Sequence, residues 1–215
     1  MPEIIIPGPA GRIEAKYHRQ NATESAPVAL ILHPHPLYGG TMNNKVTYTL
    51  YQTFVKQGFN VMRFNYRGVG KSQGSFGSGE GELSDAAAAL DWLQTDNKNA
   101  PSFWVAGFSF GAWIAMQLLM RRPELEGFIA VAPPANKYDF NFLAPCPVSG
   151  QMIQGTADEI VSPDAVRTLA AKLSKQKGVQ VELQEVEGAD HFFKDHLTAV
   201  SDIVATYIHL HAKKK

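Results

Sequence analysis

Two short segments of the chain carry the pattern Gly-x-Ser-x-Gly, which can present a serine hydroxyl for nucleophilic attack. In residues 107–111, an apolar run precedes the pattern and a helical pattern follows it, so Ser109 is expected on a sharp turn between a strand and a helix. In residues 70–74, the pattern is followed by Ser-Phe-Gly-Ser-Gly, which cannot begin a helix at once. The sequence therefore predicts that Ser109 is the nucleophile and that Ser72 is not.

A serine hydroxyl needs a general base to take its proton, and the base needs an acid to orient it. In folds that carry the nucleophile on this kind of turn, the serine comes first along the chain, the acid second and the histidine last. Asp158 comes just after one apolar run, and His191 lies between the last predicted strand and the last predicted helix. We therefore predict a catalytic triad of Ser109, Asp158 and His191 at the carboxyl edge of a sheet, where open α/β folds place their sites.

Other side chains could fill the roles of acid and base. The rival acids are Asp190, Glu159 and Asp164, and the rival bases are His196, His33 and His35. Asp190 is adjacent to His191 in the sequence, and neighbours rarely face each other well enough for one to orient the other's ring. His33 and His35 could suggest a metal site, but two histidines without a third ligand support one only weakly. No metal is predicted.

Strand and helix patterns alternate along the chain. Strands are predicted at residues 4–6, 13–17, 28–32, 59–65, 102–107, 127–132, 148–154 and 179–186, and helices at 46–54, 82–95, 110–121, 163–175 and 197–208. Residues 28–32 form a short continuous apolar run, which is typical of a strand buried on both faces. The alternation predicts an α/β fold, with a mostly parallel central sheet, an antiparallel N-terminal hairpin and helices on both faces. No linker divides the chain, so residues 1–215 are expected to form one domain.

The composition of the chain argues against some classes of binding partner. Lys plus Arg and Asp plus Glu each number 20, and a formal net charge of zero argues against a nucleic-acid partner. No apolar run approaches the ~20 residues that cross a bilayer, and the N-terminus has no secretory pattern. The single cysteine, Cys146, cannot form an internal disulfide. We expect a cytoplasmic protein with no membrane partner, and we leave homodimer formation open.

Three loops resemble those of a known superfamily. Residues 154–161 are similar to the acid loop of the α/β-hydrolases, residues 188–193 to their histidine loop, and residues 65–72 to the loop after an early strand. The chain resembles small uncapped serine hydrolases related in form to dienelactone hydrolases and to the prolyl-oligopeptidase catalytic domain. The resemblance implies the α/β-hydrolase fold. Dienelactone hydrolases carry a cysteine nucleophile where this chain has Ser109, so their substrate is not carried over.

An oxyanion hole needs two backbone N–H groups, and one should be that of Phe110, the residue after the nucleophile. The other should come from residues 33–40, His-Pro-His-Pro-Leu-Tyr-Gly-Gly, which depart from the family's usual His-Gly start. Because proline has no N–H, Pro34 and Pro36 cannot donate. His35 is the first candidate and Leu37 the second.

These residues together predict a serine hydrolase that cleaves a carboxylic ester or similar acyl bond of a small substrate through an acyl-enzyme, without a cofactor. The alternatives are an acyltransferase or a peptidase with the same triad, and a non-catalytic binding protein on the same fold. Residues 132–147 are too few for a helical cap domain. We expect a shallow cleft walled by this segment and by the loop that bears Leu37 and Tyr38.

Overall fold

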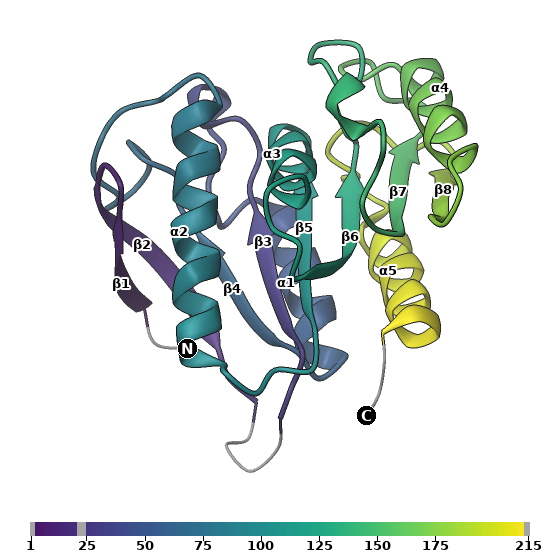
Figure 1. The fold of residues 1–215 in the computed structure, drawn as a ribbon. Coiled ribbons are helices and arrows are strands. Elements are labelled where there is room, and N and C mark those ends of the chain that lie inside the picture. The colour runs from purple at the N-terminus through teal and green to yellow at the C-terminus, as the bar shows by residue number, and fades with distance from the viewer. Residues whose placement is uncertain (1–2, 21–24, 213–215) are drawn as a thin grey trace.

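The computed structural model describes residues 3–20 and 25–212, and these form an eight-stranded sheet (Figure 1). The strands are β1 (Glu3–Gly8), β2 (Gly11–His18), β3 (Val28–Leu32), β4 (Asn60–Phe64), β5 (Phe103–Phe108), β6 (Leu125–Val131), β7 (Gly150–Gly155) and β8 (Val181–Val186). Their order across the sheet is β1-β2-β4-β3-β5-β6-β7-β8. The β1–β2 and β2–β4 pairs are antiparallel, and the other pairs are parallel. The predicted fold class is confirmed.

Helices cover both faces of the sheet. They are α1 (Lys45–Lys56), α2 (Glu80–Asp96), α3 (Phe110–Leu119), α4 (Pro163–Ser174) and α5 (Leu197–His211). In Figure 1, α2, α3 and α4 lie in front of the sheet, while α1 and α5 lie behind it. Polar caps begin two of these helices: the Asn44 side chain accepts the N–H of Val46, and the Ser162 side chain accepts that of Ala165.

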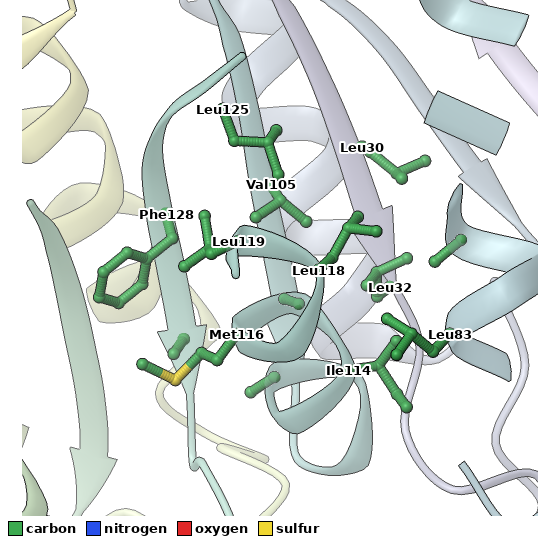
Figure 2. Close-up of a cluster of buried hydrophobic side chains, with 14 of the residues drawn as sticks. Leu30, Leu32, Leu83, Val105, Ile114, Met116, Leu118, Leu119, Leu125 and Phe128 are labelled. Carbon is green, nitrogen blue, oxygen red and sulfur yellow. The ribbon is translucent and has the colours of Figure 1, made fainter. Parts of the chain in front are cut away.

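Helix α3 is the most deeply buried helix near the centre of the sheet, and it follows Ser109 directly. Figure 2 shows its apolar side chains packed against those of β3, β5 and β6. The side chains labelled there are Leu30, Leu32, Leu83, Val105, Ile114, Met116, Leu118, Leu119, Leu125 and Phe128. Burial of each such side chain stabilises the fold by about 1.5–3 kcal/mol. The turn that carries Ser109 is therefore held between two well-packed elements.

The predicted elements are all present, with ends that differ by a few residues. No strand start differs from its predicted position by more than two residues, and β6 is one example, since it begins at Leu125 rather than at residue 127. Glu126 interrupts the apolar run there, but it is exposed between buried neighbours, as a strand permits. Two short 3-10 helices, Pro36–Tyr38 and Asn141–Leu143, were not predicted. In the described part of the chain, no helix has the length and apolar character needed to span a bilayer.

Candidate active site

Ser109 lies on the turn between β5 and α3 in a backbone conformation that L residues rarely adopt. Its φ is 54° and its ψ is −119°, and its N–H donates to the Val131 carbonyl at 2.8 Å. The two glycines of the motif permit close approach of the chain. A Cβ on Gly107 would lie 2.2 Å from the Gly111 carbonyl oxygen, and one on Gly111 would lie 2.4 Å from that of Leu32. Only glycine fits at these two positions.

The structure brings the three predicted triad side chains together. β5, β7 and β8 run parallel, so the loops after them meet at one edge of the sheet (Figure 1). There, His191 Nε2 lies 3.1 Å from Ser109 Oγ, and His191 Nδ1 lies 2.8 Å from Asp158 Oδ2. The Asp158 and His191 side chains are buried. This arrangement lets the imidazole take a proton from the serine while the carboxylate balances the resulting charge.

Asp158 accepts hydrogen bonds at both of its carboxylate oxygens. Oδ1 accepts the N–H groups of Ile160 and Val161, both at 2.8 Å, and Oδ2 accepts the Gln154 side-chain amide at 3.0 Å as well as His191. Burial alone would raise the pKa of Asp158, but the bonds from His191 and from the two N–H groups outweigh it and lower the pKa. The carboxylate is therefore charged at neutral pH.

Gln154 is a residue of the site that the sequence does not predict. Its amide nitrogen donates to Asp158 Oδ2 and also to the carbonyls of Gly155 and Val161, at 3.1 and 3.3 Å. Gln154 is fully buried in β7, so its side chain is fixed behind the carboxylate. The sequence does show a glutamine at the end of the predicted strand 148–154. The structure buries every position of β7, and a buried polar side chain needs hydrogen-bond partners inside the protein.

Within the described residues, none of the rival acids and bases is hydrogen-bonded to Ser109 or to the His191 ring. Asp190 Oδ1 accepts the N–H of Lys194 at 3.1 Å, which is a local turn contact. Asp164 is exposed and pairs with Arg167, and Glu159 is also exposed. His196 precedes the first residue of α5.

Ser72, the centre of the second Gly-x-Ser-x-Gly pattern, has a structural role. Its hydroxyl donates to the Asn65 carbonyl at 2.6 Å and accepts the Glu14 N–H at 2.9 Å. These bonds tie the loop after β4 to β2. Ser72 is buried and has no positive φ, so it lacks the exposure and the backbone shape of a nucleophile.

His33 joins the loop after β3 to the loop after β4. Its Nδ1 donates to the Pro34 carbonyl at 2.7 Å, and its Nε2 accepts the N–H of Tyr66 at 3.1 Å. Burial lowers the pKa of His33 to about 3, against a smaller opposing effect of the Pro34 bond. Both ring nitrogens are occupied, so His33 shapes the loop. Among the residues placed by the structure, no group of three or more His, Cys, Asp or Glu side chains could hold a metal ion.

Acid should destabilise the protein through His33. Between pH ~3 and pH ~6.5 the unfolded chain binds a proton at this histidine and the folded chain does not, so stability falls as the pH falls. From pH 7 to pH 5 this loss should be roughly 2 kcal/mol. Urea unfolding at pH 7 and at pH 5 would measure this loss of unfolding free energy. In His33→Gln, the loss between the two pH values should be smaller by that amount. In His209→Gln, a change at an exposed site, the loss should be the same as in the wild type. If His33→Gln lost as much unfolding free energy between pH 7 and pH 5 as the wild type, the pH dependence would not come from His33.

Two backbone N–H groups beside Ser109 are free to bind an oxyanion. No acceptor within residues 3–20 and 25–212 bonds the N–H of Phe110 or that of His35. The N–H of Leu37, the second candidate, donates to His35 Nδ1 at 3.2 Å and is occupied. The His35 ring lies between Phe76 and Phe110, at centroid distances of 4.9 and 4.8 Å. These contacts hold the His35 backbone in place.

A pocket of about 370 Å³ opens beside Ser109. It is lined by Pro34, His35, Tyr38, Gly39, Gly40, Asn44, Ser109, Phe110, Pro134, Lys137, Tyr138, Ile160, Val161, His191 and Phe192. The predicted walls are present, but their members differ. Tyr38 lines the pocket whereas Leu37 points into solvent, and of the aromatic residues in 132–147 only Tyr138 lines it, because Phe140 and Phe142 stack on each other elsewhere.

The chain is similar to known proteins over most of its length. The family model described as X-Pro dipeptidyl-peptidase (S15 family) matches residues 11–203. An uncharacterized protein of Rickettsia prowazekii is 52% identical over 212 residues, which cover 97% of this chain and 89% of the relative.

Two solved structures share the fold over nearly the whole chain. A protein of unknown function from Agrobacterium tumefaciens, grouped with the α/β hydrolases, is 52% identical with a TM-score of 0.93, covering 97% of this chain and 95% of the other. A serine hydrolase without a lid from Xanthomonas campestris is 31% identical with a TM-score of 0.90, covering 100% of this chain and 96% of the other. The chain is a serine hydrolase of the α/β fold, and it belongs to the S15 family within the α/β-hydrolase superfamily.

Proposed function

We propose that this protein hydrolyses carboxylic esters of small acyl substrates through an acyl-enzyme on Ser109. The observation that carries the proposal is the continuous hydrogen-bonded chain from Asp158 through His191 to Ser109 at the wall of an open pocket. The free N–H groups of Phe110 and His35 beside the serine support it further.

The reaction follows from this arrangement. Ser109 Oγ attacks the carbonyl carbon as its proton passes to His191 Nε2, and the N–H groups of Phe110 and His35 stabilise the tetrahedral oxyanion. His191 then gives the proton to the leaving alkoxide, which departs as an alcohol. Water, deprotonated by His191, attacks the acyl-enzyme, and the acid is released as the serine regains its proton. The charged Asp158 stabilises the imidazolium of His191 during both acylation and deacylation.

Labelling and mass measurement test this proposal. A fluorophosphonate should modify Ser109 in the wild-type protein, and a slowly hydrolysed ester should leave an acyl group on the same residue. Product analysis in the presence of an added alcohol or amine separates hydrolysis from acyl transfer. A protein that neither reacts with the label nor turns over any ester would be a non-catalytic binding protein instead.

The family match favours a peptidase as the second candidate. An X-Pro dipeptidyl substrate carries an amino-terminal ammonium, since an α-amino group titrates near ~7.7–8.0. Such a substrate needs an anionic partner in the pocket, and among the described lining residues there is no Asp or Glu, while Lys137 is a cation. The lining therefore favours esters. Rates with an X-Pro 4-nitroanilide and with 4-nitrophenyl butyrate compare the two directly.

Chain length of the acyl group should affect the rate over only a few carbons. Each methylene that the apolar wall covers is worth about 0.8 kcal/mol, or roughly fourfold in kcat/KM. In a 4-nitrophenyl ester series, kcat/KM should rise from acetyl to about hexanoyl and then level off, because a longer tail leaves the wall and enters water. A steady rise to palmitoyl would mean that the pocket continues into a long apolar channel.

A further inference from the structure

We propose that the pocket selects acyl substrates that carry an anionic oxygen group, a carboxylate or a phosphate, and that the ammonium of Lys137 binds this group. The inference rests on the proposed ester hydrolysis and adds a substrate class to it. It follows from what the lining residues can donate and accept.

Two polar side chains of the lining, Asn44 and His35, have an occupied acceptor atom and a free donor. Asn44 Oδ1 accepts the N–H groups of Val46 and Thr47 at 3.0 and 3.3 Å, which leaves its NH₂ group available. His35 Nδ1 accepts the N–H of Leu37, so in the neutral ring the proton is on Nε2. Both side chains therefore present N–H donors, which suit an anionic ligand.

Two buried carboxylates close to the pocket, those of Asp158 and Glu82, are already bound by the protein. The four hydrogen bonds described above occupy both oxygens of Asp158. Glu82, which lies near His35, is fully buried and accepts the N–H groups of Gly77 and Gly79 at 2.8 and 2.7 Å. Neither carboxylate is free to attract a cationic substrate or to neutralise Lys137.

The backbone of Lys137 is fixed beside the pocket. The N–H groups of Lys137 and Tyr138 both donate to the Pro134 carbonyl at 3.0 Å, which closes a tight turn after β6. The Tyr138 ring stacks on Trp113 at 4.3 Å between centroids. The exposed Lys137 side chain thus starts from a rigid segment.

The ammonium of Lys137 has no ion-pair partner among residues 3–20 and 25–212. Its neighbours in the lining include Tyr138, Ile160 and Phe192, whose apolar surfaces exclude part of the solvent. A charge pair beside such surfaces is screened less than one in open water. A substrate anion can therefore pair with Lys137 without displacing a protein carboxylate.

Two matched pairs of substrates test the proposal without assuming which side of the ester faces Lys137. The leaving-group pair is 4-acetoxybenzoate and its methyl ester, and the acyl pair is mono(4-nitrophenyl) adipate and 4-nitrophenyl hexanoate. For the wild-type protein, kcat/KM should favour the anionic member of at least one pair by about fivefold to tenfold. This preference should decline as the ionic strength rises to about 1 M.

Variants separate the role of Lys137 from a general effect of charge. Lys137→Met should abolish the preference within the pairs, Lys137→Arg should retain it, and Lys56→Met, which removes a charge on α1 outside the lining, should have no effect. Equal rates within both pairs, or a preference that survives in Lys137→Met, would overturn the proposal. Hydrolysis of the neutral esters in that case would leave the proposed function intact.

Discussion

Replacement of Ser109 by alanine should lower kcat for ester hydrolysis by at least about three orders of magnitude while the protein remains folded. The change removes the atom that forms the acyl-enzyme, and the side chain that remains fits the same turn. Ser109 lies only 3.1 Å from His191 Nε2, so no other described hydroxyl can take over the proton transfer without a rearrangement. Steady-state kinetics with 4-nitrophenyl butyrate, alongside circular dichroism, would measure both parts of this expectation.

Ser72→Ala is the matched control, because it removes the serine of the other Gly-x-Ser-x-Gly pattern. It should retain turnover but lose about 1–3 kcal/mol of stability, since the buried Asn65 carbonyl and Glu14 N–H each lose a partner. If Ser72→Ala abolished turnover in folded protein and Ser109→Ala did not, Ser109 would not be the nucleophile.

Asp158→Asn should lower kcat by about 10⁴-fold with little change in the shape of the site. An asparagine amide that keeps its carbonyl on the Ile160 and Val161 N–H groups turns its NH₂ toward His191 Nδ1. The imidazole then adopts the tautomer with its proton on Nε2, which cannot accept the serine proton. Stopped-time assays over hours would be needed to quantify the residual rate.

Asp190→Asn separates Asp158 from its nearest rival. Within the described residues, the Asp190 side chain has one hydrogen bond, from the Lys194 N–H in the local turn, so this variant should keep kcat within about threefold of the wild type. A large loss in Asp190→Asn together with a small loss in Asp158→Asn would identify Asp190 as the acid.

Local patterns were enough to predict the strands and the α-helices of this fold. β3 is a continuous apolar run buried on both faces, and its sequence can be recognised because a strand between two helical layers has no polar side. The Ser109 turn was predicted because strand, serine and helix are contiguous in the sequence. Asp158 and His191 could be placed because parallel strands bring the loops after them to one edge. Their catalytic roles remain predictions until the variants are measured.

The choice between His35 and Leu37 could not be made from the sequence. Both residues follow a proline in the same loop and both carry an N–H. The structure distinguishes them because the His35 ring folds back and accepts the Leu37 N–H, while Phe76 and Phe110 hold that ring. The 3-10 helix Pro36–Tyr38 went unpredicted for a related reason, since a single turn leaves too short a pattern.

The sequence by itself determined the order of strands and helices, the α/β class and the residue types available at the sheet edge, because these depend on contacts within a few residues. Tertiary structure alone decided that Gln154 supports Asp158, that Tyr138 rather than Phe140 lines the pocket, and that Lys137 has no ion-pair partner there among the described residues. Each of these depends on packing between segments far apart in the chain. Hydrogen bonds and burial at such contacts are set by three-dimensional neighbours, which no local pattern of residues specifies.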